Sequence, residues 1–183
     1  MKDLNILRDN VHANAVEKGF WDTPLSDKHY LMLVITELSE AIEADRKDKR
    51  ADISRFMYES NLLQPKQISE WQYHFNITIH NSIEDELADA FIRTLDLAGS
   101  KGTDLVIDPF VVEEMAESCI DETFIETIYS IIDFYIITDN MEINRLLQAI
   151  LGLAKYMKID LFWHIEQKMK YNKSREKMHG KKY

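Results

Sequence analysis

Apolar residues recur every three or four positions along most of this chain, which is the period of a helix with one buried face. The predicted helices cover residues 3–18, 28–49, 83–100, 140–157 and 161–177, with one or two more between residues 110 and 138. Residues 50–82 contain aromatic side chains without clear turns, and we interpret them as a helical insertion. Because only 5 glycines and 3 prolines interrupt the pattern, the sequence predicts an all-α protein.

The length and composition bound the organisation of the chain. With 183 residues, 45% of them apolar, the chain is long enough for one well-buried core. We therefore predict a single domain over residues 1–183, with insertions at about 50–82 and 106–140 and a basic tail at 176–183. Such a tail is suited to closing over a polyphosphate. The alternative is a solvated, frayed chain end.

Charge and cysteine content exclude several classes of protein. The net charge of −10 argues against a broad contact surface for duplex nucleic acid. No run reaches the roughly 18 apolar residues of a membrane span, and the first ten residues lack the apolar core of a signal peptide. Cys119 is the single cysteine, which excludes an intramolecular disulfide, and we interpret it as a buried apolar residue. We expect a cytoplasmic protein without a membrane partner.

Two short acidic units lie inside predicted helices, Glu37-Leu-Ser-Glu40 and Glu86-Leu-Ala-Asp89. Helical residues three positions apart point in one direction, so two facing pairs would offer the oxygen ligands that Mg²⁺ prefers beside substrate phosphates. Spacing alone does not establish a metal site, because acids make up 32 of the 183 residues and chance produces several such pairs. The alternative is ordinary surface acids with one buried, hydrogen-bonded glutamate.

The surroundings of each unit differ. On a helical wheel Glu37 falls inside a broad apolar arc and Glu40 at its edge, where an unpaired carboxylate is costly. A buried Glu37 therefore needs a cation, a hydrogen-bond network or a raised pKa. Glu86 and Asp89 fall opposite the apolar arc of their helix, which is also the pattern of a solvated face.

One face of the last predicted helix changes from apolar to polar and basic along its length. Leu161 and Ile165 are followed on the same narrow arc by Lys168, Asn172 and Arg175. An ammonium and a guanidinium at the rim of a core are suited to phosphate oxygens, with the amide on sugar or phosphate. The alternative is that basic residues near a helix C-terminus are there because they interact favourably with the helix dipole.

Four segments, in this order, resemble the MazG-like all-α nucleoside triphosphate pyrophosphohydrolases. They are HANAVEKGFW, ITELSEAIEADR, EDELADAFIRTLDLAG and KIDLFWHIEQKMKYNKSREKMHGKKY. The resemblance implies a helical bundle of that type and a homodimer or homotetramer. It also implies Mg²⁺, or Mn²⁺ in its place, held by Glu37, Glu40, Glu86 and Asp89. The 45 residues between the two acidic units (41–85) resemble the longer spacing of the dimeric deoxyuridine nucleotide hydrolases of that superfamily.

The resemblance also implies a reaction, the cleavage of a (deoxy)nucleoside triphosphate to a monophosphate and pyrophosphate. Glu37 and Glu40 are the predicted catalytic residues, Glu37 as a ligand or as the base that orients water. For the base pocket we nominate His12, Asn14 and Trp21, since an amide can read a base edge and an indole can stack on it. A surface position for His12 and a core position for Trp21 remain the alternatives.

Two other functions are compatible with the same residues. One is an enzyme like phosphoribosyl-ATP pyrophosphohydrolase. The other is a catalytically silent helical scaffold that binds a partner protein.

Overall fold

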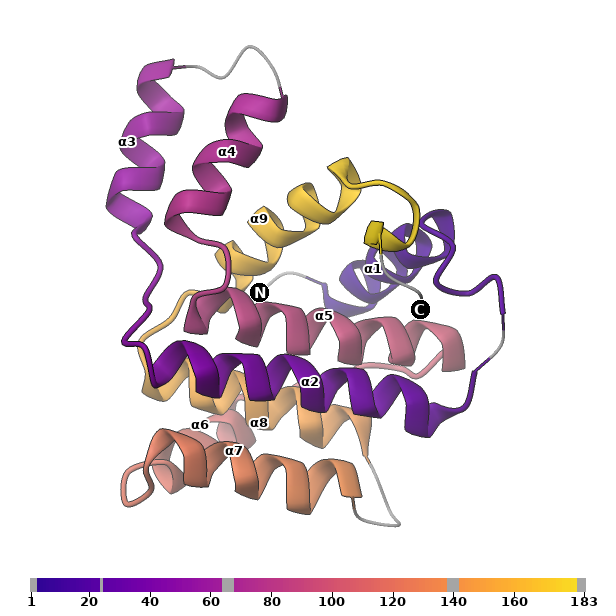
Figure 1. The fold of residues 1–183 in the computed structure, drawn as a ribbon. Coiled ribbons are helices and arrows are strands. Elements are labelled where there is room, and N and C mark those ends of the chain that lie inside the picture. Colours follow the sequence, from indigo (N-terminus) through magenta and orange to yellow (C-terminus); the bar gives the residue numbers. More distant parts are fainter. Residues whose placement is uncertain (1–2, 24, 64–67, 138–141, 181–183) are drawn as a thin grey trace.

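The computed structural model describes residues 3–23, 25–63, 68–137 and 142–180, and every regular element within these ranges is a helix (Figure 1). The α-helices are α1 Leu4–Glu17, α2 Asp27–Asp45, α3 Ile53–Leu63, α4 Ile68–Thr78, α5 Ile83–Lys101, α6 Pro109–Ser118, α7 Phe124–Ile132, α8 Ile143–Tyr156 and α9 Leu161–Ser174. A π-helix, η1 Asp133–Ile137, follows α7, and a 3₁₀ turn, η2 Lys177–Gly180, follows α9. The all-α prediction is confirmed for these residues.

Helix α5 lies at the centre of the bundle. It packs against α2, α1, α9 and α8, and α2 runs beside it in the opposite direction (Figure 1). Helices α1 and α9 cover one side of the α2–α5 pair, and α6, α7 and α8 cover the other. Leu87, Phe91 and Leu95 of α5 are fully buried as a result. The two helices that carry the acidic units are therefore direct neighbours.

Local signals in the sequence fix the ends of these helices. The Ser82 hydroxyl accepts a hydrogen bond from the backbone N–H of Asp85 and caps α5. Gly102 ends α5 in a left-handed conformation with φ of 60°. The Asp160 carboxylate caps α9, since it accepts a hydrogen bond from the backbone N–H of Trp163 at 3.1 Å.

Two predicted helices end early. Helix α2 stops at Asp45 rather than at residue 49, because the chain turns back there, and the Lys49 N–H donates to the carbonyl of Ala44. Helix α9 stops at Ser174 rather than at residue 177, because Arg175 takes an extended conformation.

The insertion predicted at 50–82 is a helical hairpin, α3 and α4, that projects from the bundle (Figure 1). It has a small core of its own, formed by Phe56, Trp71, Phe75 and Ile79. Trp163 and Tyr171 of α9 pack against this cluster and join it to the bundle. The hairpin therefore depends on aromatic contacts with a single helix.

The second predicted insertion, 106–140, forms α6, α7 and η1, and its last residues lie outside the described ranges. Cys119 follows α6 and is 2% exposed, as predicted, with its thiol donating to the carbonyl of Met115. Within the described part of the chain, none of the helices combines the length and the apolar character that crossing a membrane requires.

Candidate metal centre

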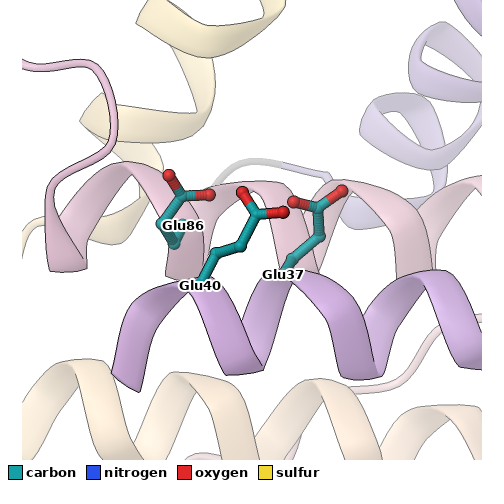
Figure 2. Close-up of side chains that lie close together, drawn as sticks. All are labelled: Glu37, Glu40 and Glu86. Atoms are coloured by element: carbon teal, nitrogen blue, oxygen red, sulfur yellow. The ribbon is translucent and has the colours of Figure 1, made fainter. Parts of the chain in front are cut away.

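Three of the four predicted metal ligands converge between α2 and α5. Glu37 and Glu40 project from α2 and Glu86 from α5, toward one another (Figure 2). One carboxylate oxygen from each residue lies within 4.8 Å of the other two. A set of carboxylate oxygens at this separation is the type of ligand group that hard divalent cations prefer.

Glu86 is the least compensated of these acids. Its side chain is 2% exposed, and no described residue forms a hydrogen bond or an ion pair with its carboxylate. Burial, and then the negative charges of Asp89, Asp85 and Glu37, raise the pKa of Glu86 to about 9, although Lys168 opposes them. Without a cation beside it, this carboxyl group therefore holds a proton at neutral pH.

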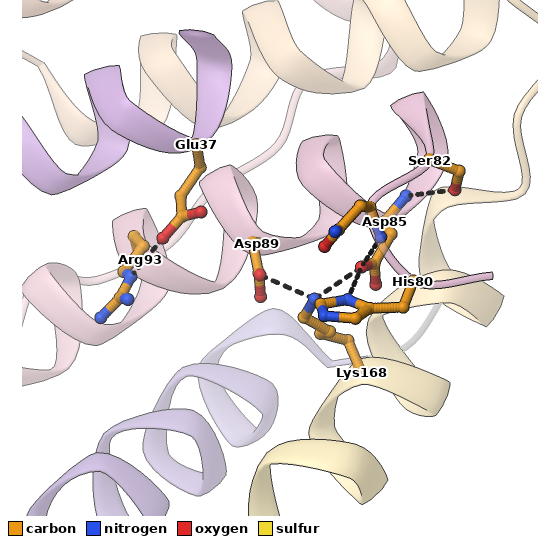
Figure 3. A network of polar contacts seen from close by, with 8 residues as sticks. Glu37, His80, Ser82, Asp85, Asp89, Arg93 and Lys168 are labelled. Atoms are coloured by element: carbon orange, nitrogen blue, oxygen red, sulfur yellow. Dashed lines mark hydrogen bonds and ion pairs between the residues drawn. The ribbon is translucent and has the colours of Figure 1, made fainter. Parts of the chain in front are cut away.

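Glu37 already has a cationic partner. The residue is 4% exposed, which confirms the burial predicted from its place in the apolar arc. The Nε of Arg93 donates to its carboxylate at 3.0 Å (Figure 3), and the same guanidinium lies over the ring of Phe20. Glu40, by contrast, is exposed to solvent. The group therefore combines one paired, one unpaired and one solvated carboxylate.

Asp89, the fourth predicted ligand, is turned toward a different partner. Its carboxylate lies 2.8 Å from the ammonium of Lys168, which also donates to Asp85 at 2.7 Å (Figure 3). His80 and the backbone N–H of Asn81 contact the same oxygen of Asp85. Asp89 is therefore one turn of α5 away from Glu86 but belongs to an ion-paired network rather than to the group of three.

Lys168 lies at the centre of this network. The sequence placed Lys168 among the phosphate ligands, but its side chain is 2% exposed and is engaged by two carboxylates. Burial alone would lower its pKa, but the charges of Asp89 and Asp85 hold the pKa of Lys168 above its usual value. The residue that sequence reasoning missed is Asp85, because nothing in its spacing distinguishes it from the acids on either side.

The other residues predicted on the last helix lie around a small hollow. Asn14 of α1 lines it together with Asp89, Asn172 and Arg175, and its volume is about 50 Å³. The turn η2 closes over one edge, where Arg175 donates to the carbonyl of His179 at 3.0 Å. The part of the predicted basic tail that the structure describes is therefore folded against the bundle.

His12 and Trp21 lie behind that hollow. The Nδ1 of His12 and the indole N–H of Trp21 both contact one oxygen of Asp96, at 2.7 and 2.9 Å. The Trp21 ring also stacks on Tyr30. Asp96 lines the hollow and is 7% exposed, and burial raises its pKa. The polar atoms predicted to read a base are thus directed at Asp96.

A larger cavity, of about 400 Å³, lies among α6, α7, η1 and α8. None of the predicted metal-binding, catalytic or substrate-binding residues lines this cavity.

Comparison of the chain with protein-family models, with curated proteins and with solved structures gave no match.

Proposed function

We propose that this protein is a Mg²⁺-dependent nucleotide pyrophosphohydrolase that converts a (deoxy)nucleoside triphosphate to a monophosphate and pyrophosphate. The observation that carries the proposal is the group of Glu37, Glu40 and Glu86, in which a buried carboxylate has no partner among the described residues. The reaction itself is proposed from the MazG-like character of the sequence.

Different residues of the chain would bind the cation and the substrate in this reaction. Glu37, Glu40 and Glu86 would hold the cation, and bound Mg²⁺ would supply charge neutralisation for the phosphate oxygens. Asn14, Asn172 and Arg175 would bind sugar and phosphate oxygens of the substrate, since two amides and a guanidinium fork suit such groups. Their hollow of about 50 Å³ is too small to enclose a base, which would lie outside it.

The bond changes follow from hydrolysis at the first phosphate. The oxygen of a water molecule forms a bond to the α-phosphorus, and the bond from that phosphorus to the bridging oxygen breaks. The electron pair of this bond leaves with pyrophosphate. Glu37 or Glu40 accepts a proton from the attacking water.

A second candidate, a catalytically silent scaffold, is favoured by a specific observation. Two of the four predicted ligands are already balanced by cations of the protein, Glu37 by Arg93 and Asp89 by Lys168. In a scaffold these ion pairs would be permanent. In the enzyme Glu37, which Arg93 already contacts, would bind the cation as well.

An activity assay separates the two candidates. We expect pyrophosphate release that requires Mg²⁺ or Mn²⁺ from at least one member of a panel of deoxynucleotides and phosphoribosyl-ATP. Glu40→Gln should lower kcat by roughly 100-fold or more, because even partners of metal ligands contribute about 10–100-fold. Its helical circular dichroism should not change, since Glu40 is exposed.

The matched control is Glu117→Gln, an exposed glutamate of α6 whose substitution removes the same charge. It should retain full activity. If no substrate of the panel releases pyrophosphate, the enzyme is excluded and the scaffold is the remaining candidate. If Glu40→Gln is fully active, Glu40 is not part of the catalytic site.

A further inference from the structure

A second hollow adjoins the acidic group. It has a volume of about 210 Å³, and its lining residues are Glu40, Glu43, Ala44, Lys47, Lys49, Asn81 and Glu86. It shares no lining residue with the hollow of Asn14. The α5 residues that line the hollow of Asn14 begin at Asp89, whereas Glu86 lines this second hollow. The three converging carboxylates therefore have a separate hollow on either side along α5.

The two lysines of this hollow are available to a ligand. Within the described ranges the Lys47 ammonium has an ion pair only at the limiting distance of 4.0 Å, with Glu43. Among the described residues, none forms a hydrogen bond or ion pair with the ammonium of Lys49. Both side chains are exposed, so their charges are hydrated rather than committed to the fold. This distinguishes them from Lys168, which is buried between two carboxylates.

The backbone that carries these lysines is held in place. The carbonyl of Lys49 accepts from the N–H of Ile83, the first residue of α5. Next to it, Arg50 and the N–H of Ala51 both bind the carboxylate of Glu84, at 2.6 and 2.9 Å. The segment is therefore fastened to the N-terminal end of α5, where the helix dipole favours an anion.

We propose that this hollow binds the pyrophosphate part of the substrate, with Lys47 and Lys49 contacting the β- and γ-phosphate oxygens. The inference rests on the proposed function and assigns the orientation of the nucleotide in the site. The nucleoside lies on the Asn14 side, the scissile bond at the three carboxylates, and the leaving group at the lysines. The volume equals that of several water molecules of about 30 Å³ each, which suits two phosphate groups.

Charge complementarity explains why this side receives the leaving group. The glutamates of this hollow alone would repel phosphates, but a divalent cation held by Glu40 and Glu86 would offset their negative charges and offer a positive partner to phosphate oxygens. Lysine then provides point charges for a highly charged product that must also depart. Exposed lysines achieve this more readily than a buried pair, because only the Lys47–Glu43 contact, at 4.0 Å, has to be given up.

The test measures the binding of pyrophosphate in the presence of Mg²⁺ by calorimetry on the full chain. Lys47→Ala/Lys49→Ala should weaken this affinity at least tenfold, because two phosphate contacts are lost. The control, Lys28→Ala/Lys155→Ala, removes the same charge from exposed positions elsewhere. It should change the affinity less than twofold. An equal affinity in Lys47→Ala/Lys49→Ala and the unaltered chain overturns the inference.

Titration with Mg²⁺ alone distinguishes this inference from the proposed function. If the unaltered chain does not bind Mg²⁺, and therefore binds no pyrophosphate with it, both proposals fail. If the chain binds Mg²⁺ and hydrolyses nucleotides but Lys47→Ala/Lys49→Ala binds pyrophosphate normally, only the assignment of the leaving group fails. We expect Lys47→Ala/Lys49→Ala to bind Mg²⁺ alone within twofold of the unaltered chain.

Discussion

At the scale of single residues, Lys168 shows how the polar interior is balanced. Its ammonium lies 2.7 Å from Asp85 and 2.8 Å from Asp89, and it is almost inaccessible to solvent. Removing a charge from water is costly, and a buried pair compensates for that cost only when its geometry is good. The network is therefore sensitive to the loss of one partner rather than a large net source of stability.

Lys168→Met should reduce the free energy of unfolding by about 3–5 kcal/mol, because it removes the ammonium from the buried carboxylate of Asp85 and the partly buried carboxylate of Asp89. Urea denaturation measures the change. Lys173→Met, at an exposed position of the same helix, should stay within about 0.5 kcal/mol of the unaltered chain. A loss below about 1 kcal/mol in Lys168→Met would contradict the assigned role of the ion pairs.

Individual residues also show which features of a site can be predicted from the sequence. The burial of Glu37 was predicted correctly, because its apolar neighbours lie on the same helix and their pattern is visible in one segment. The burial of Glu86 was not, because its face of α5 is covered by other helices rather than by an apolar stripe of its own. The ion pair of Lys168 with Asp85 likewise joins residues 83 positions apart.

At the scale of elements, the α3–α4 hairpin was the least well predicted region. Its aromatic residues pack on one another and on α9, so they do not form a continuous stripe facing the main core. The ring of Phe75 stacks on Tyr171 at 4.7 Å, and Phe56 meets Trp163 edge to face. The type of element could be predicted, but its contacts depend on a helix nearly a hundred residues later.

Trp163→Ala should loosen the hairpin selectively, because it removes a large ring from the cluster that joins α4 to α9. Hydrogen exchange in α3 and α4 should quicken by about tenfold or more, which corresponds to about 1.4 kcal/mol of local stability. Exchange in α2 and α5 should change little.

Phe162→Ala is the matched control, since Phe162 on the same helix meets Phe91 of the main core instead. It should quicken exchange in α5 and α9 rather than in the hairpin. Equal effects of the two substitutions on the hairpin would show that its stability does not depend on Trp163.

At the scale of the whole molecule, the acidic group and the hydrophobic core share helix α5. Helix α5 contacts most other helices of the bundle and also carries Glu86, Asp85 and Asp89. Negative charge concentrated between α2 and α5 opposes their packing, and a cation bound there would relieve it. Occupancy of the site should therefore affect the global stability and not only the local structure.

We expect Mg²⁺ to raise Tm relative to a chelator, and more at pH 8.5 than at pH 6. The pKa of Glu86 is about 9 in the folded chain and 4.5 as its ordinary value. Between these values the folded state binds the extra proton, so the stability without metal falls as pH rises. At 100 times its dissociation constant, Mg²⁺ contributes about 2.7 kcal/mol, or about 5–10 °C.

Glu86→Gln supplies the control for this measurement. Its neutral side chain removes the group that titrates, so the metal-free protein should no longer lose stability over this pH range through this residue. The gain in Tm with Mg²⁺ should also fall. An undiminished gain in Glu86→Gln would show that the cation binds elsewhere.

The burial of Cys119 has a practical consequence for following these changes. A maleimide dye reacts with the thiolate, and burial raises the pKa of the Cys119 thiol while limiting access to it. A cysteine introduced in place of the exposed Tyr73 on α4 would then be labelled with little background. Fluorescence from that position would report whether the hairpin moves in the intact chain when Mg²⁺ is added.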